Sequence, residues 1–307
     1  MSTTDPQQAH EALLNHPDYR VLTRAQYPLL TETPEHANLR TAAFLNIETT
    51  GLDPNAHEII QLSILPFTYT LETNEITSFE PIESQYQQPK APDGIPNSAT
   101  LHNGITNTDV QGQHFNLDKL TQIINNTDLL IAHHAAFVRP FTERLLPVTE
   151  NKPWACLRAD IPWLNEGVTR ETLEHLSMIN GLFFDEFDHE GKVLAAINIL
   201  TKNLPRSEER ILAALRRHAG MTTHRILITN HDISNRHDFQ ARRYRWSQGD
   251  SPTLPRGWWK DVHETNLEQE LTWLRTTILQ DTHDNTEIPT TPYNAFHRYS
   301  DRPLPQQ

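Results

Sequence analysis

The stretch FLNIETTGLDP, residues 44–54, combines an apolar run with an abrupt polar end. The apolar run begins earlier, and TAAFLNIE at 41–48 is typical of a strand that ends at the turn sequence TTG. A second apolar run follows at 58–67, and its first half alternates between polar and apolar residues. Residues 69–81 alternate in the same way, so we predict that a hairpin continues the sheet there.

Segments with helical spacing follow and alternate with one more apolar run. Residues 128–133, DLLIAH, form a continuous run that suits a buried strand. Pro140 is expected to begin or kink one of the helices. The predicted helices are 117–126, 135–146, 170–181 and 192–204. Strands followed by helices that alternate with a further strand predict an α/β domain.

Shorter segments flank this domain. The predicted elements before it are a helix at 10–25 and a turn-rich linker at 28–34, and residues 82–99 within it form a proline-rich loop. Those after it are a helix to about 218, a strand at 225–230, a helix at 238–244, strand-like segments at 243–246 and 257–262, and a helix at 266–279. The predicted division is an N-terminal helical arm and linker (1–40), an α/β domain (41–204), a small basic α+β module (205–284) and a loose tail (285–307).

The composition is that of a globular chain. Its 307 residues include 26 Lys+Arg and 39 Asp+Glu, a formal net charge of −13, with 36% hydrophobic residues and a mean hydropathy of −0.60. No stretch approaches the roughly 18 apolar residues of a membrane span, and the N-terminus lacks a secretory pattern. The single cysteine, Cys156, excludes an intramolecular disulfide and a cysteine-based zinc site. We therefore expect a cytoplasmic protein with no membrane partner.

The negative charge is unevenly distributed. Residues 204–260 contain eleven basic and five acidic side chains, a charge of +6, so the remaining 250 residues carry −19. This asymmetry indicates two modules with different surroundings. A net charge of −13 therefore does not exclude nucleic acid as a partner.

Four segments of the α/β domain resemble one family. FLNIETTGLDP (44–54) resembles the first motif of the DnaQ-like 3′-5′ exonucleases (DEDDh type, RNase T superfamily), and LHNGIT (101–106) is similar to a segment that follows it. LIAHHAAFVRPFTERLLP (130–147) resembles the second motif, and GLFFDEFDHEGKVLAAINILTKNLP (181–205) aligns with the third. The resemblance implies an RNase H-like fold, in which helices flank a mixed central sheet. RYRW, GWWKDV, LTWLR and RYSDR also resemble the C-terminal extension of a bacterial subgroup.

The catalytic positions of that family are mostly replaced. Members hold two Mg²⁺ or Mn²⁺ ions with four carboxylates and activate water with a histidine. The five matching positions here are Asn46, Glu48, Val138, Phe187 and Lys192. Asn46 offers only a neutral carbonyl, and Val138 offers no ligand. Phe187 cannot move a proton, and Lys192 places a cation where a metal's charge would sit. The sequence predicts a pseudo-exonuclease with no metal cofactor and no intact catalytic set.

The replacements are mutually consistent. Four carboxylates without metal would repel one another, whereas Glu48 and Lys192 leave the pocket neutral. We predict that the Lys192 ammonium approaches the Glu48 carboxylate, directly or through Asn46. The alternative is that Lys192 extends into solvent.

Nearby residues do not suggest a replacement site. The candidates are Asp185, Glu186, Asp188, His189 and Glu190 beside the third motif, and His134 beside the second. His189 would need an acid five residues later, where Leu194 stands. Acids clustered in a loop are typical of a solvated surface, and the pair His133-His134 is interpreted as the end of a buried strand.

The segment ARRYRWSQGDSPTLPRGWWKD, residues 241–261, interleaves basic and aromatic side chains. Cations that follow phosphates, beside rings that stack on bases, suit single-stranded nucleic acid. Because a small module needs aromatic core residues, Trp246 and Trp258 are assigned to the core. The predicted nucleic-acid-binding residues are Arg242, Arg243, Tyr244, Arg245, Trp259 and Lys260. The alternative is a structural or protein-docking role for this cluster.

Three functions follow as alternatives. The first is a catalytically inactive protein that binds nucleic acid as an accessory or regulatory factor. The second is an interaction subunit whose exonuclease-like domain is a scaffold inside a larger assembly. The third is a residually active, metal-dependent 3′-5′ exonuclease, which rests on fold analogy alone.

Overall fold

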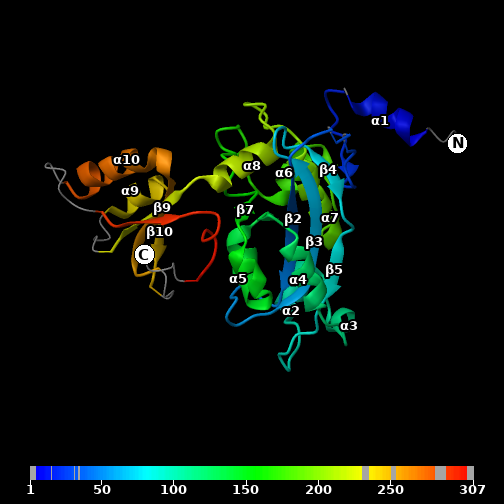
Figure 1. Cartoon of the computed structure of the whole chain (residues 1–307), viewed down its shortest axis with the longest axis horizontal. Helices are drawn as coiled ribbons and strands as arrows, with labels where there is room; N and C mark the ends of the chain where they lie inside the picture. The colour runs from blue at the N-terminus through cyan, green and yellow to red at the C-terminus, as the bar shows by residue number, and fades with distance from the viewer. Residues whose placement is uncertain are drawn as a thin grey trace. The chain divides into compact units, whose positions relative to one another are not determined.

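The computed structural model describes residues 5–14, 16–30, 32–33, 35–229, 235–249, 254–280 and 288–302. The chain divides into two units, residues 1–216 and 217–307, both drawn in Figure 1. Helix α8 (Ile211–Gly220) contains the point of division, which the sequence analysis placed at 204/205. The guanidinium of Arg216 lies 4.8 Å from the ring centroid of Tyr69, so the first part of this helix belongs with the first unit.

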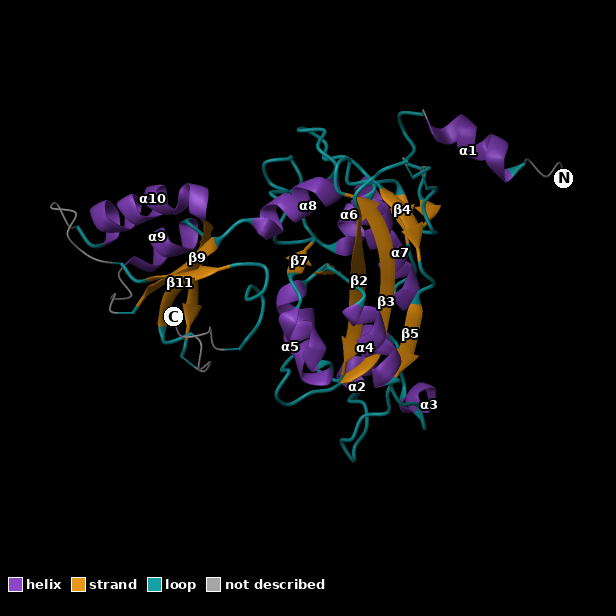
Figure 2. Cartoon of the chain, in the orientation of Figure 1, coloured by secondary structure: helices purple, strands orange, loops and turns teal. Residues whose placement is uncertain are grey.

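The first unit is built on a six-stranded mixed sheet, shown in Figure 2. Its strands are β2 (Leu39–Thr49), β3 (Ile59–Thr70), β4 (Ile76–Phe79), β5 (Glu83–Tyr86), β6 (Leu129–Ala132) and β7 (Trp154–Cys156). The order is β4-β3-β2-β6-β7, with β5 also paired to β3. Strand β2 runs antiparallel to β3 and parallel to β6. This is the mixed sheet that the resemblance implied. Strand β5 was missed because its residues lie in the stretch interpreted as loop.

Helices flank this sheet, as the resemblance implied (Figure 2). They are α2 (Asn97–Asn103), α3 (Asn107–Val110), α4 (Leu117–Asn125), α5 (Ala135–Leu145), the 3₁₀ helix η1 (Pro147–Asn151), α6 (Leu173–Ile179) and α7 (His189–Leu200). Helix α7 begins three residues before the predicted start. Asp188 caps it, since the Gly191 backbone N–H donates to the Asp188 carboxylate at 2.8 Å.

The N-terminal arm contains a shorter helix than predicted. Helix α1 (Pro6–Leu14) ends well before residue 25, because Pro17 disfavours helical backbone in the residue before it. Beyond it, β1 (Thr23–Arg24) pairs in parallel with β8 (Leu182–Phe183). Arg24 also forms an ion pair with Asp185 at 2.7 Å. The arm is thereby attached to the segment that leads into α7.

The second unit has a four-stranded antiparallel sheet in the order β10-β11-β9-β12. Its elements are β9 (Thr223–Ile228), α9 (Arg236–Ala241), β10 (Arg245–Ser247), β11 (Gly257–His263), α10 (Glu264–Trp273), the π-helical η3 (Leu274–Ile278) and β12 (Thr290–Tyr293). The prediction of a loose tail after residue 284 is wrong for β12, which pairs with β9. Pro292 is accommodated because β12 is an edge strand. The predicted strand end at residue 230 and the far ends of the arm and tail lie outside the described residues.

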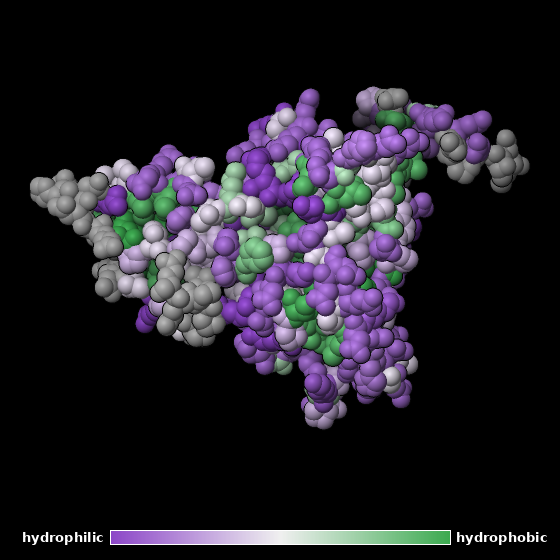
Figure 3. All heavy atoms as spheres, in the orientation of Figure 1, coloured by the Kyte–Doolittle hydropathy of each residue, from purple (hydrophilic) through white to green (hydrophobic). Residues whose placement is uncertain are grey.

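The described helices include none that is both long enough and apolar enough to cross a membrane. On the face of the first unit seen in Figure 3, polar residues (purple) predominate, and apolar residues (green) show only in separate areas. Apart from Leu39 at the start of β2, the large apolar side chains of β2, β3 and β6 are instead buried in the core.

Candidate functional site

Strand β2 presents Asn46 and Glu48 on the same face of the sheet, because side chains alternate along a strand. On β3, Ser63 lies opposite Asn46 and Gln61 lies opposite Glu48. The register shifts directly after Glu48, where the strand gives way to the turn. Glu48 therefore lies at the last regular position of the β2–β3 pairing.

The turn after Glu48 explains the sequence TTG. The Thr49 hydroxyl donates a hydrogen bond to the Gly51 carbonyl at 2.6 Å, and the Thr50 backbone N–H donates to the Glu58 carbonyl at 2.9 Å. A Cβ atom at Gly51 would overlap the imidazole of His57, so any larger residue would require that ring to move. This close packing holds the strand end at which Glu48 is located.

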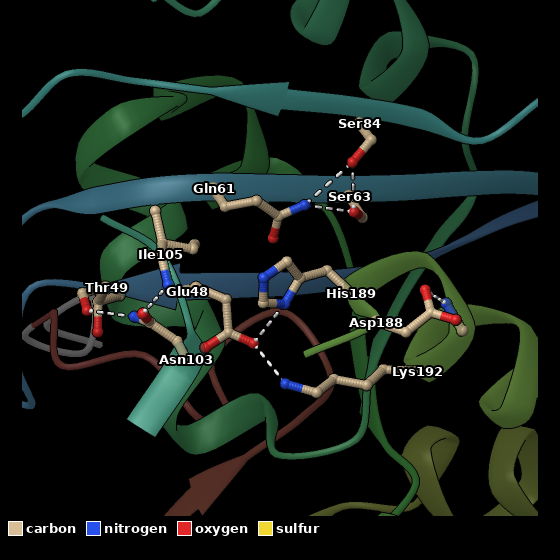
Figure 4. Close-up of polar contacts among 11 residues, drawn as sticks. Glu48, Thr49, Gln61, Ser63, Ser84, Asn103, Ile105, Asp188, His189 and Lys192 are labelled. Atoms are coloured by element: carbon tan, nitrogen blue, oxygen red, sulfur yellow. Dashed lines mark hydrogen bonds and ion pairs between the residues drawn. The ribbon is translucent and has the colours of Figure 1, made fainter. Parts of the chain in front are cut away.

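The carboxylate of Glu48 is the centre of the site (Figure 4). It is 8% exposed, and one of its oxygens accepts hydrogen bonds from Lys192 Nζ at 2.7 Å and His189 Nδ1 at 3.2 Å. The prediction that Lys192 approaches Glu48 is confirmed, and the contact is direct rather than through Asn46. The alternative that Lys192 extends into solvent is wrong, because its side chain is only 17% exposed.

His189 is the member of this site that the sequence analysis missed. A catalytic role for His189 would require an acid five residues later, where Leu194 stands. Its partner in the structure is instead Glu48, which lies 141 residues earlier in the chain. Both hydrogen-bond donors, His189 and Lys192, come from the first turn of α7 and are three residues apart, so they lie on one face of the helix. That spacing was the sequence pattern that could have indicated a paired role.

The two hydrogen bonds decide the ionisation of Glu48. Burial alone would raise the pKa of Glu48, but the hydrogen bond from His189 and the charge and hydrogen bond of Lys192 outweigh it. The pKa is therefore lowered from its ordinary value of 4.5. Glu48 remains an anion that is neutralised inside the protein.

This lowered pKa predicts a pH dependence. The stability contributed by Glu48 is expected to be fully present above its ordinary pKa of 4.5 and lost as the pH falls through the lower folded value. The measurement is the difference in free energy of unfolding between the wild type and Glu48→Gln, from about pH 7 to about pH 3. The difference should shrink below about pH 4. A difference that is constant down to pH 3 would contradict the assignment.

The side chains at the other three matching positions, Asn46, Val138 and Phe187, make no hydrogen bond to Glu48 among the described residues. Val138 is buried in α5, and its carbonyl accepts the Thr142 hydroxyl at 2.7 Å. The Asn46 amide nitrogen is buried without a hydrogen-bond partner among the described residues. Phe187 is 49% exposed and packs on Gly104, where a Cβ atom would overlap its ring.

The nearby acids and histidines have other roles. Asp185 binds Arg24, Asp188 caps α7, and Glu186 and Glu190 are exposed. The described part of the chain contains no group of three or more His, Cys, Asp or Glu residues placed to hold a metal ion.

The two neighbouring histidines lie at the end of β6, as interpreted from the sequence. His133 Nε2 is 2.7 Å from the Glu171 carbonyl, and burial lowers the pKa of His133. His134 is exposed and stacks on Phe137.

In the second unit, part of the predicted nucleic-acid-binding set surrounds Glu270 of α10. Arg242 donates two hydrogen bonds to this carboxylate, at 3.1 and 3.0 Å, and Lys260 donates one at 2.9 Å. Glu270 is 5% exposed. Arg242 and Lys260 therefore stabilise the unit internally, because their charges are matched by a buried acid.

Tyr244 is also a core residue, so its prediction as a binding residue is wrong. It is 4% exposed and packs against Phe239 with ring centroids 5.1 Å apart. Burial raises the pKa of Tyr244 well above its ordinary range. Trp258 stacks on Phe239 in the same core, as predicted, whereas Trp246 is half-buried and packs edge-on against Trp258.

Of the remaining members of the predicted set, Arg243 and Arg245 are exposed and Trp259 is half-buried. Arg243 has a left-handed backbone with φ 65°, and Arg245 lies 5.3 Å from the Trp259 ring centroid. No acidic partner of Arg243 or Arg245 occurs among the described residues.

The charge of the second unit differs from that of the basic segment. Residues 217–307 contain eleven Lys+Arg and eleven Asp+Glu, so the unit has no formal net charge and residues 1–216 carry all of the −13. Acids of α10 and of the C-terminal segment compensate the arginines. Basic character is therefore a property of local surfaces here, not of the whole unit.

Comparison with known proteins matches part of the first unit to one protein family. Residues 44–154 match the RNase T family of exonucleases. The chain matches no protein with a curated description. It resembles zinc-bound E. coli exonuclease I in complex with single-stranded DNA at 16% identity and a TM-score of 0.47, covering 73% of this chain and 63% of that one.

Two further solved structures are similar to this chain, with identities of 15% and 17%. E. coli exonuclease I with a dA16 oligonucleotide has 15% identity and a TM-score of 0.47, with 73% of this chain and 63% of that chain covered. A full-length 3′-exonuclease has 17% identity and a TM-score of 0.39, with 59% and 66% covered. The chain thus spans less than two thirds of the length of these proteins.

Proposed function

We propose that this chain, which carries a DnaQ-like exonuclease-family domain over residues 44–154, is a catalytically inactive member that binds nucleic acid as an accessory or regulatory protein. The observation that carries the first half is the 2.7 Å contact between Lys192 Nζ and Glu48. The one carboxylate that remains at the family's catalytic positions is neutralised by a side chain of the protein itself.

The donor set does not fit the two Mg²⁺ or Mn²⁺ ions of the family. Hard divalent cations require several anionic oxygens, and the positions that would supply them are Asn46, Val138 and Lys192. Glu48 is engaged by two other donors. An ion placed here would also meet the ammonium of Lys192 at close range, which is repulsive. We therefore assign no metal-dependent step to this site.

The site also lacks a free general base. Phe187 occupies the position of the family's histidine and has no proton-accepting atom. His189 is nearby, but its Nδ1 is 3.2 Å from Glu48 and its ring is buried. It therefore serves to hold the carboxylate.

A nuclease assay tests the inactive site. With a 3′-labelled single-stranded oligonucleotide and Mg²⁺ or Mn²⁺, the wild type is expected to produce no shortening, and Glu48→Gln is expected to behave identically. The physical reason is that no metal-bound water can be generated here. Metal-dependent shortening that Glu48→Gln abolishes would overturn the proposal. Shortening that persists in Glu48→Gln would identify a contaminating nuclease.

The proposed nucleic-acid binding is supported by the exposed Arg245 beside Trp259 and is tested by a binding measurement. Affinity for single-stranded DNA or RNA is expected to fall steeply as salt is raised from about 50 to about 200 mM, because phosphate contacts release counterions. The absence of binding at about 50 mM salt would favour the scaffold alternative.

A further inference from the structure

The sheet of the second unit has two chemically different faces. One carries Ile226, Ile228 and Trp258, which join the core formed with residues of α9 and α10. Because side chains alternate along each strand, Arg225 of β9 and Trp259 of β11 lie on the opposite face. Cross-strand pairing adds Arg245 of β10 and Tyr293 of β12 to that face.

These four side chains form a row with one member from each strand. The Arg245 guanidinium lies 5.3 Å from the Trp259 ring centroid. The Arg225 guanidinium lies 4.6 Å from the same ring and 4.5 Å from that of Tyr293. Cations and rings therefore alternate across the whole sheet. These four residues define what we call the arginine–aromatic face.

The two arginines of this face are held differently. Arg225 donates two hydrogen bonds to Asp261, both at 2.7 Å, so its charge is matched. Arg245 is exposed on an edge strand, and no acid contacts it among the described residues. A guanidinium that stacks on a ring uses its flat face and leaves its N–H donors in plane. Trp259 therefore orients Arg245 without occupying its hydrogen-bond donors.

We propose that the arginine–aromatic face binds single-stranded nucleic acid, with Arg245 donating to a backbone phosphate. This proposal rests on the nucleic-acid binding in the proposed function and locates it. Arginine matches a phosphate with two parallel hydrogen bonds, and a base can stack on the outer side of its planar guanidinium. The half-buried Trp259 supplies a flat, ordered support beneath Arg245, while Tyr293 is buried and packs against Arg225.

The distribution of acids favours an anionic partner on this face. The exposed carboxylates Glu264 and Glu268 belong to α10, which packs on the opposite face of the sheet through Leu271. On the arginine–aromatic face, the acid paired with Arg225 is Asp261. Among the described residues of this face, the charge left without an opposite partner is that of Arg245, and a phosphate bound there would be attracted to it.

The test measures binding of the full chain to fluorescently labelled oligothymidylate and oligouridylate of about 20 nucleotides. Fluorescence anisotropy reports the affinity at each salt concentration of a series. Arg245→Ala is expected to weaken binding about fivefold or more and to reduce the slope of log K against log salt by about 0.7. Arg245→Lys should keep the slope but lose part of the affinity, because it retains charge without the planar stack.

Arg236→Ala is the matched control. Arg236 is also exposed and begins α9, which contributes Phe239 to the core on the opposite face. Binding by this variant should equal that of the wild type. Thermal unfolding of each variant confirms that it is folded.

The outcomes separate this proposal from the proposed function. If the wild type binds and Arg245→Ala binds equally well, the assignment of binding to the arginine–aromatic face is wrong, but the proposal that the chain binds nucleic acid stands. If the wild type does not bind at about 50 mM salt, both fail. Tighter binding of oligoglutamate than of oligonucleotide would assign the face to an acidic protein and would also overturn the proposal.

Discussion

Replacing Lys192 by methionine is expected to lower the free energy of unfolding by about 3–5 kcal/mol at neutral pH. The substitution leaves the Glu48 carboxylate in a site where it is 8% exposed, without the ammonium that now lies 2.7 Å away. An ionised carboxylate that loses its partner inside a protein bears the cost of its desolvation. His189 alone must then stabilise it. Denaturant unfolding followed by circular dichroism measures the loss.

Two variants make the Lys192 result specific. Lys202→Met removes an exposed lysine just beyond the end of the same helix and is expected to change stability by less than about 0.5 kcal/mol. The double variant Glu48→Gln/Lys192→Met should be more stable than Lys192→Met alone, because a neutral amide needs no cation. A Lys192→Met protein within about 1 kcal/mol of the wild type would show that the pair is not what stabilises this site.

The second large effect is expected at Glu270 in the other unit. Glu270→Gln should lower the free energy of unfolding by about 2–3 kcal/mol, since it removes the anion that receives both Arg242 and Lys260. The cost is smaller than at Glu48 because Arg242 and Lys260 are partly exposed and can reach water. Burial would raise the pKa of Glu270, but the hydrogen bonds and charges of its two partners lower it.

Glu268→Gln provides the control for Glu270. Glu268 lies on the same helix but is exposed, so its replacement should alter stability by less than about 0.5 kcal/mol. Amide hydrogen exchange should show the loss of protection in Glu270→Gln within β11 and α10. Equal stability of the two variants would mean that Arg242 and Lys260 do not depend on Glu270, and the assignment of these residues to the interior of the unit would fail.

Several features were predictable from the sequence because they depend on local patterns. The apolar run ending in TTG predicted β2 and its turn, and the run at 128–133 predicted β6. The contact between Glu48 and Lys192 was predicted because the family resemblance places both residues in one pocket, where a carboxylate and an ammonium attract. Strand β12 was not predictable in the same way, because TTPY resembles loop until β9 lies beside it.

Tertiary structure determines which arginines and aromatic rings are paired inside the protein and which remain exposed. In the sequence, Arg242 and Arg245 are three residues apart in one basic–aromatic run, yet Arg242 binds Glu270 and Arg245 stacks on Trp259. Glu270 lies 28 residues beyond Arg242, so no local pattern indicates the pairing. The same holds for His189, whose partner Glu48 is 141 residues away.

Sequence alone was therefore sufficient for the strands around FLNIETTGLDP, because residue type and spacing indicate them. Only the tertiary structure showed which cations are neutralised inside the protein and which remain exposed. The physical reason is that the availability of a charge depends on burial and on the distance to an opposite charge. Those quantities are set by segments that meet only when the chain is folded.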